Sequence, residues 1–352
     1  MKTGLVSLIG RPNAGKSTLL NRLVGTKLAI VSDKPQTTRN RILGVRNYED
    51  AQVVFLDTPG IHRPLHRMNV RMVDAALETI REVDVLGLVV DAPEAGGKGD
   101  DFVLDLARQS TALVFLILNK IDLMKRSRLL PLIDAYRTKA DFAEIVPVSA
   151  ATGENVDRLE RAIIDRLPEG EPMYPADYLT DQPERFFARE IVREKLLQFT
   201  RAEIPFSSAV VIDRFEEPDA TPAGEEPQAG LAGGAGQVGR VGQAGQAGQA
   251  GQVGQVGQVG QVGRGGPVGH VQGPPGRPPG GPMLKLYCTI VVDRESQKPI
   301  VVGRGGEMIK RIGMAAREDL ERFFGARVFL DLHVRVKSEW REDDGVLSDL
   351  GL

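Results

Sequence analysis

Short apolar runs alternate with amphipathic stretches through the first half of the chain, residues 1–168. The apolar runs have the length of buried strands, and the stretches between them have helical spacing. The predicted strands are 4–9, 52–56, 85–90, 112–118 and 145–148, and the predicted helices are 17–24, 69–81, 100–109, 128–139 and 155–167. Continuous apolar strands that alternate with helices indicate an α/β domain with a mostly parallel sheet covered on both faces.

The second half has a different order of elements. Proline and turn formers in 169–183 predict a linker, and an amphipathic helix follows at 184–200. Strands are predicted at 207–215, 284–294 and 326–337, with two helical stretches before the last. In that last strand, apolar residues at every second position share one face: Val328, Leu330, Leu332, Val334 and Val336. Residues 184–352 therefore read as a small α+β domain of order α-β-β-α-α-β.

This second domain is interrupted by a low-complexity segment, residues 216–282. Gly, Gln, Val, Ala and Pro dominate it, and its centre repeats every three residues, "GQAGQAGQAGQVGQVGQVGQVG". Such a composition offers few apolar side chains to bury and a high ordering cost for glycine, so the segment is predicted to be disordered. A collagen-like structure is the alternative, but the repeat centre has no proline.

Composition narrows the class of protein. A length of 352 residues suggests about two domains. A net charge of −2 carries no global signature of nucleic-acid binding, so any basic surface must be local. The single cysteine, Cys288, lies in an apolar strand and excludes a disulfide framework, which favours the cytosol. No apolar run is long enough to span a bilayer, and the basic-apolar start runs directly into a motif, so no targeting segment is expected.

The motif "GRPNAGKST" at 10–18 follows a strand and precedes a helix, as a phosphate-binding loop does. Its glycines let backbone amides approach phosphates at a helix N-terminus. We expect Lys16 to reach the β- and γ-phosphates and the Ser17 hydroxyl to ligate Mg²⁺. The loop residues expected at the nucleotide are Gly10, Arg11, Pro12, Asn13, Ala14, Gly15, Lys16, Ser17 and Thr18.

Three further motifs follow predicted strands and point to GTP. In "DTPGI", Asp57 is suited to hold Mg²⁺ and the Gly60 amide to contact the γ-phosphate. In "NKID", the Asp122 carboxylate can accept from two guanine donors that adenine lacks. In "SAATGENV", the backbone at 149–150 can offer an amide to guanine O6. The residues expected to contact GTP from these motifs are Asp57, Thr58, Pro59, Gly60, Ile61, Asn119, Lys120, Ile121, Asp122, Ser149 and Ala150.

These motifs resemble the Era family of GTPases, within the TrmE–Era group. The resemblance also covers "SDKPQTTRNRILG" at 32–44 and "PIVVGRGGEMIKRIGMAAREDLERFFGARVFLDLHVRVKSEWR" in the second half, and only 216–282 departs from it. It implies a GTPase domain, residues 1–168, and a KH domain of type II, residues 184–352. It also implies that the protein binds the 3′ end of small-subunit rRNA and assists small-subunit maturation.

The resemblance assigns further site residues. Thr38 matches a switch threonine that ligates Mg²⁺ in the GTP state, which gives a metal set of Ser17, Thr38 and Asp57. "GRGG" matches the loop that clamps the nucleic-acid backbone in KH domains. The residues expected to contact single-stranded RNA are Gly303, Arg304, Gly305, Gly306, Lys310 and Arg311. Ten Lys or Arg against six Asp or Glu in 298–341 agree with a local basic surface, although an ordinary mixed surface would also give this count.

Hydrolysis raises a separate question at Ile61. Ras-like switches have a glutamine there that orients the attacking water, and an isoleucine side chain cannot do so. Asn13 lies where relatives are thought to coordinate K⁺ beside the phosphates, so Lys16, Thr38, Asp57, Gly60 and Asn13 are the expected catalytic set, with Mg²⁺ and K⁺ as cofactors. The alternative is that Asn13 only braces its loop.

A second function stays open at this point. The protein could be a GTPase that regulates another partner, a tRNA-modification or membrane-linked complex, with the KH-like half binding protein. The expectation that the resemblance favours is a cytoplasmic monomer that binds GTP and GDP, rRNA and the small ribosomal subunit. Weak peripheral association with the inner face of the cell membrane is part of the same expectation.

Overall fold

The structure, a computed structural model, describes residues 1–32, 34, 37–60, 67–201, 204–217 and 283–352. The described residues belong to one compact unit. The predicted disorder of 216–282 falls outside the described residues from 218 onward, so it stays a prediction.

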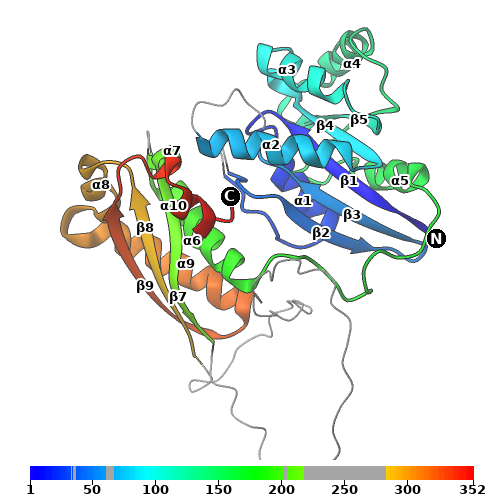
Figure 1. Ribbon diagram of the computed structural model, residues 1–352. Coiled ribbons are helices and arrows are strands. Elements are labelled where there is room, and N and C mark those ends of the chain that lie inside the picture. The colour runs from blue at the N-terminus through cyan, green and yellow to red at the C-terminus, as the bar shows by residue number, and fades with distance from the viewer. Residues whose placement is uncertain (33, 35–36, 61–66, 202–203, 218–282) are drawn as a thin grey trace, which may run out of the picture. The chain divides into compact units, whose positions relative to one another are not determined.

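The first half folds around a six-stranded sheet of order β2-β3-β1-β4-β5-β6. All neighbouring strands are parallel except β2, which runs antiparallel to β3. The strands are β1 Lys2–Gly10, β2 Ile42–Asn47, β3 Ala51–Asp57, β4 Val85–Asp91, β5 Leu113–Asn119 and β6 Glu144–Pro147. The predicted, mostly parallel α/β sheet is confirmed (Figure 1).

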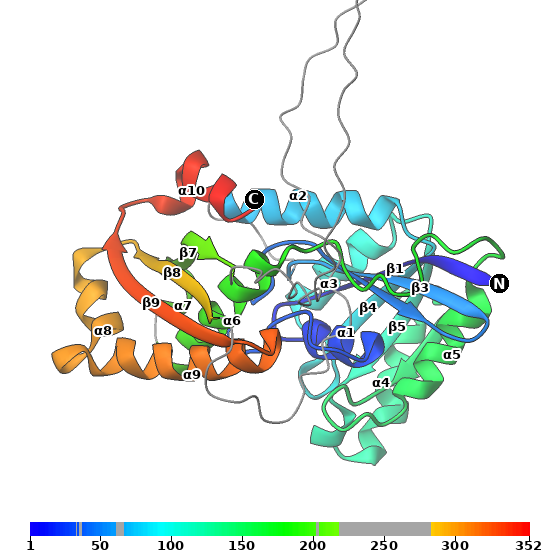
Figure 2. The same cartoon turned by 90° about the horizontal axis from the view of Figure 1, so that it is seen from below.

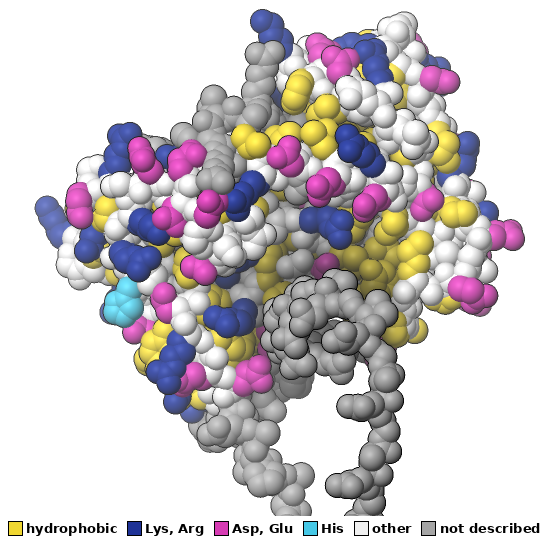
Figure 3. Space-filling model, viewed as in Figure 1, with side chains coloured by type: hydrophobic (Ala, Val, Ile, Leu, Met, Phe, Trp, Pro, Cys, Tyr) yellow, Lys and Arg dark blue, Asp and Glu magenta, His cyan; other side chains and the backbone are white. Residues whose placement is uncertain are grey.

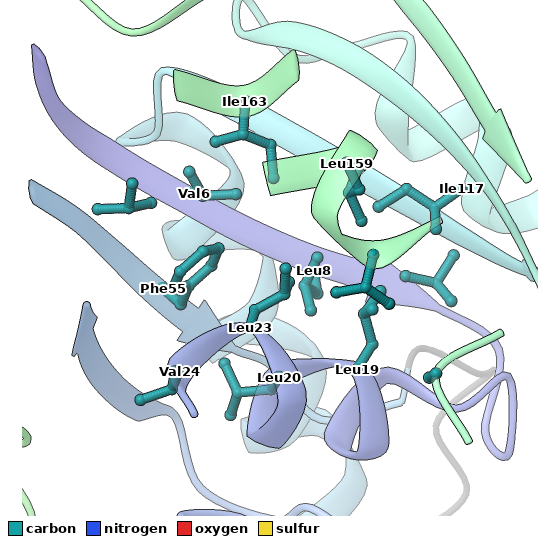
Figure 4. Close-up of a cluster of buried hydrophobic side chains, with 14 of the residues drawn as sticks. Val6, Leu8, Leu19, Leu20, Leu23, Val24, Phe55, Ile117, Leu159 and Ile163 are labelled. Atoms are coloured by element: carbon teal, nitrogen blue, oxygen red, sulfur yellow. The ribbon is translucent and has the colours of Figure 1, made fainter. Parts of the chain in front are cut away.

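Helices cover both faces of this sheet. They are α1 Lys16–Val24, α2 Arg67–Arg81, α3 Lys98–Ala107, α4 Leu129–Arg137 and α5 Val156–Arg166. One hydrophobic core packs α1 and α5 on the sheet, with Leu8, Leu23 and Leu159 fully buried (Figure 4). A second core packs α2, α3 and α4 on the other face. The two cores fix the carboxyl ends of the parallel strands, where the predicted nucleotide loops emerge.

The second half forms a three-stranded sheet of order β7-β8-β9, with α6 and α9 on one face and α10 on the other. Its elements are α6 Glu184–Phe199, α7 Ile204–Ser207, β7 Ser208–Glu216, β8 Met283–Val292, α8 Lys298–Val302, α9 Glu307–Phe324, β9 Arg327–Val336 and α10 Asp344–Asp349. β8 is antiparallel to β7 and parallel to β9. Figure 2 shows α9 and α10 on opposite sides of this sheet. The order α-β-β-α-α-β agrees with the predicted KH domain.

Several elements differ from the sequence prediction, and the short helices α7 and α10 are two that were not expected. β2 was not expected, because Ile42–Asn47 is a short edge strand that ends in exposed polar residues and has no run of alternating apolar side chains. β7 extends to Glu216, which pairs with Lys285 on β8, so the first residue of the low-complexity segment belongs to the sheet. In the described part of the chain, no helix combines the length and the apolar character needed to cross a bilayer.

Candidate nucleotide site and nucleic-acid interface

The loop between β1 and α1 has the backbone of a phosphate-binding loop. Gly15 is in the left-handed region with φ of 91°, and a Cβ there would lie 2.2 Å from Asn119 Nδ2. Asn13 is also left-handed, with φ of 64°. Only glycine fits at position 15 because of both constraints, whereas asparagine tolerates position 13 better than most residues do.

Lys16 lies buried in this loop with its ammonium folded toward the backbone. Its Nζ donates to Gly10 O at 3.2 Å and to Arg11 O at 3.0 Å. Burial lowers the pKa of Lys16 to about 8, and the nearby Asp57 carboxylate opposes that shift. A phosphate at the loop would stabilise the ionised ammonium further, so the site suits an anionic ligand.

The three predicted metal ligands converge at one point although they are far apart in the sequence. Ser17 Oγ and Thr38 Oγ1 lie 2.7 Å apart, and each donates to Asp57 Oδ2, at 3.2 and 3.0 Å. The other carboxylate oxygen, Asp57 Oδ1, is buried and accepts no hydrogen bond from any side chain or amide in the described part of the chain. Burial raises the pKa of Asp57, while Lys16 and the two hydroxyls favour its ionised form. Two hydroxyls and an under-used carboxylate are hard oxygen donors that fit Mg²⁺.

Asn119 joins two of the motif loops. Its Nδ2 donates to Ala14 O at 2.8 Å, and its Oδ1 accepts from the Ala150 amide at 3.0 Å. The Ser149 amide donates to Glu154 O. Both amides predicted for guanine O6 are therefore engaged within the protein, and a base contact there would have to displace one of these hydrogen bonds.

A cavity of about 370 Å³ lies beside these groups. From the predicted site it is lined by Pro12, Asn13, Gly15, Lys16, Ser17, Thr18, Thr38, Gly60 and Lys120. Ile61 lies outside the described residues. Asp122 is exposed in a short 3₁₀ helix, Ile121–Leu123, and does not line the cavity. The cavity thus corresponds to the phosphate side of the predicted site.

Sequence reasoning missed several residues that line the same cavity, namely Ile30, Val31, Ser32, Asp91 and Glu94, whereas Thr37 belongs to the switch loop expected there. Asp91 ends β4 and pairs with Lys120 at 2.6 Å between Oδ2 and Nζ. Its place at the carboxyl end of a parallel strand was a usable signal. Ile30 and Val31 carry no motif, whereas Ser32 begins the 32–44 segment that resembles the family. Arg11 also differs from expectation, because its side chain pairs with Asp100 on α3 at 2.8 Å instead of lining the cavity.

The segment before Thr38 is held from two sides. The Asn21 side chain on α1 accepts from the Leu28 and Ala29 amides at 2.9 and 2.8 Å. The buried Glu194 carboxylate on α6 accepts from the Val31 amide at 3.0 Å and from Lys27 Nζ at 2.7 Å. A helix of the second half therefore contacts the chain that lines the nucleotide cavity.

The "GRGG" loop connects α8 with α9. Its three glycines all have positive φ, 76°, 62° and 81°, and a Cβ at Gly303 would lie 2.7 Å from the backbone of Met308. Arg304 and Lys310 are exposed and form no ion pair within the described residues. Arg311 lies with its guanidinium 4.3 Å from the centre of the Phe199 ring on α6. The loop and two of the three predicted cations are thus open to a ligand, and Arg311 packs partly on its own domain.

Comparison with known proteins tests these assignments. A family model described as a 50S ribosome-binding GTPase matches residues 5–120, and a KH domain model matches 285–341. A GTPase Era from Geobacter metallireducens is 41% identical over 350 residues, which cover 99% of this chain and 97% of that protein. One from Syntrophus aciditrophicus is also 41% identical, over 99% and 95% of the two chains.

The chain belongs to the Era family of GTPases.

Two solved Era structures extend the comparison. Era in complex with MgGDPNP and nucleotides 1506–1542 of 16S ribosomal RNA matches with a TM-score of 0.80 and 36% identity, over 100% of this chain and 99% of that one. A point variant of Aquifex aeolicus Era bound to GDP·AlF₄⁻ matches with a TM-score of 0.79 and 36% identity, over the same shares. The predicted fold class and family of this Era chain are confirmed.

Proposed function

We propose that this Era chain is a GTP-hydrolysing switch that binds the 3′ region of 16S rRNA through its KH domain and assists 30S subunit maturation. The observation that carries the proposal is the convergence of Ser17, Thr38 and Asp57 within 3.2 Å beside the phosphate loop. Thr38 belongs to the segment that changes with nucleotide state in GTPases, so it can report the γ-phosphate to the rest of the molecule.

The chain's own residues would divide the work of phosphoryl transfer. Lys16 would neutralise charge on the β- and γ-phosphates, and the Gly60 amide would contact the γ-phosphate. Ser17, Thr38 and Asp57 would hold Mg²⁺, which supplies positive charge against the charge that develops in the transition state. Asp122 would select guanine.

Variants of the GRGG loop can distinguish this function from the alternative, in which the protein is a regulator whose KH half binds another protein. RNA of nucleotides 1506–1542, the segment bound in the related Era structure, is a suitable probe. Changing Arg304 and Lys310 together to Glu should weaken binding of this RNA at least tenfold, because a backbone clamp needs positive charge. Changing Arg158 and Arg161 on α5 to Glu is the matched control. Unchanged RNA affinity in the first variant would favour the alternative.

We infer that K⁺ assists hydrolysis at Asn13, because no side chain at position 61 can orient the water. The left-handed backbone of Asn13 is an independent reason for an asparagine there, so Asn13→Ala alone would confuse two effects. Asn13→Gly keeps the backbone accessible and removes the side chain. Single-turnover hydrolysis should be faster in K⁺ than in Na⁺ for the wild type and equal in both for Asn13→Gly. Equal rates for the wild type would remove K⁺ from the mechanism.

We further propose that the protein is a cytoplasmic monomer with weak peripheral membrane association. Sedimentation at micromolar concentration tests the monomer. Flotation with anionic vesicles tests the association, and a protein that stays at the bottom of the gradient would contradict it.

A further inference from the structure

The KH sheet has two faces, and only one is fully covered. Apolar residues of β8 and β9 pack under α6 and α9 on the inner face, among them Leu286, Cys288, Ile290 and Val328. On the outer face, Ala209 and Val291 pack against Trp340, Val346 and Leu347 of the C-terminal segment. That segment covers the end of the outer face near Val291, and the end near Phe329 is open.

The open end carries an aromatic pair. Tyr287 on β8 and Phe329 on β9 have ring centres 5.8 Å apart, and Phe329 is 44% exposed. Arg214 on β7 lies 5.7 Å from the Tyr287 ring. An aromatic pair across strands can simply stabilise a sheet. However, an exposed phenylalanine on an edge strand is a hazard for aggregation unless it has a partner.

Charge on this face favours a polyanion. Among the described residues of this face, Glu216 pairs with Arg214 and Lys285, Asp331 lies 3.1 Å from His333 Nε2, and Asp213 accepts from the Thr289 hydroxyl, so four Lys or Arg side chains stand against three carboxylates. Arg327 and Arg335 are exposed, and within the described residues neither has an ion-pair partner. Figure 3 views this side and shows basic, acidic and hydrophobic side chains interspersed on it. Two arginines without an ion-pair partner on the same face as the exposed Phe329 ring and the half-buried Tyr287 ring are groups of the kind that single-stranded nucleic acid needs.

The spacing along β9 fits an extended strand of RNA. Arg327, Phe329, His333 and Arg335 all point to the outer face, because side chains alternate along a strand. Positions two apart are separated by about 6.6 Å and the two arginines by about 26 Å, room for several nucleotides. The inner face of the same edge strand packs on α9, which begins at the GRGG loop. RNA leaving the loop could therefore pass around β9 onto the outer face.

We propose that the outer KH sheet face, from its open end to Arg335 at the border of the covered end, is a second RNA-binding surface, which stacks unpaired bases on Tyr287 and Phe329 and holds phosphates with Arg327 and Arg335. The proposal rests on RNA binding by the KH domain, and extends it beyond the GRGG loop. It commits to unpaired RNA as the occupant.

The test uses the full chain with RNA 1506–1542 and with nested truncations of it down to the shortest RNA that still binds. Phe329→Thr keeps a strand-forming residue and removes the ring. This change should lower the affinity for the longest RNA roughly tenfold, which is the effect of losing one stacked base. The affinity for the shortest RNA should stay unchanged. Leu113→Thr, at an exposed strand position of the first half, is the matched control. Arg327→Gln with Arg335→Gln should reduce the slope of log affinity against log salt by about 1.4.

Three outcomes would overturn the proposal. If Phe329→Thr and the double arginine variant both bind RNA of every length with wild-type affinity, the outer sheet face does not bind RNA. An equal loss for the shortest RNA would place the effect at the loop. Altered sedimentation of Phe329→Thr with unchanged RNA binding would make the face a contact between copies of this chain. The variant with Arg304 and Lys310 changed to Glu tests the proposed function independently of the sheet. If it binds RNA with wild-type affinity, RNA binding by the GRGG loop is refuted, whatever the sheet variants show.

Discussion

Left-handed residues cluster in the nucleotide loops. Asn13, Lys120 and Asn155 are three of the four non-glycine residues with positive φ in the described part of the chain. Each costs conformational free energy, which is repaid by neighbouring contacts at functional sites. The Lys120 ammonium pairs with Asp91, and the Asn155 amide donates to Pro147 O at 2.9 Å. The sequence motifs therefore mark positions of unusual backbone as well as of chemistry.

Guanine selection depends on Asp122. Asp122→Asn should weaken GTP binding about 10- to 100-fold and favour xanthine nucleotides, because the carboxylate loses one of two paired acceptors. Asp134→Asn on α4 changes a comparable exposed carboxylate away from the site. Binding titrations with both nucleotides measure the effect, and unchanged GTP affinity in Asp122→Asn would refute the assignment.

Nucleotide binding should be linked to proton uptake at Lys16. Its pKa is about 8 in the free protein, and bound phosphate would raise it. GDP affinity should therefore fall as pH rises above about 8, by up to about tenfold per pH unit. For stability the sign is opposite: between about pH 8 and the usual lysine pKa of 10.5, the unfolded chain holds more protons, so this residue makes stability rise with pH.

Calorimetry at pH 7 to 9, in buffers of different ionisation enthalpy, measures this linkage. The control is Lys16→Gln, which lacks the Lys16 ammonium, so that only the phosphates of the nucleotide titrate there. Identical pH profiles for the wild type and Lys16→Gln would contradict the assignment to Lys16.

At the scale of elements, the sequence predicted the apolar strands and the long helices well. Every residue of β3 and β4 is buried, so these strands appear in the sequence as continuous hydrophobic runs that are easy to recognise. β2 was not predicted because this edge strand forms by pairing with β3, and the hydropathy pattern of its own residues does not reveal that pairing. The phosphate side of the site was predicted through its motifs, whereas Ile30, Val31 and Ser32 reach the cavity only through tertiary contacts.

The segment 218–282 is expected to be dispensable for the fold and for GTP binding. Replacing it by a short Asn-Gly turn should leave GDP affinity unchanged. The melting temperature should stay the same or rise by a few degrees, because shortening a loop lowers its closure entropy by about 0.6 kcal/mol per halving. Thermal melts and GDP titrations of both proteins provide the comparison. Loss of soluble folded protein would show that the segment supports the structure.

At the scale of the whole molecule, Glu194 links the KH half to the nucleotide cavity. Glu194→Gln should remove the ion pair with Lys27 and keep an acceptor for the Val31 amide. The ratio of the RNA affinities in the GTP-analogue and GDP states should be roughly fivefold smaller in Glu194→Gln than in the wild type. This change corresponds to the loss of a small coupling free energy. Glu184→Gln, an exposed position on the same helix, is the control. An unchanged ratio of the two affinities would exclude Glu194 from the coupling.

The pairing of Glu216 with Lys285 has a consequence for the speed of folding. In an uninterrupted hairpin, β7 and β8 would meet early as neighbours in sequence, but here about seventy residues separate the paired ends. A contact of such separation raises the contact order of a domain that is otherwise local. If β7–β8 pairing is part of the transition state, refolding of this KH domain is slowed while its unfolding rate is unaffected. During synthesis, the GTPase domain would then be complete well before the central strand β8 could join its sheet.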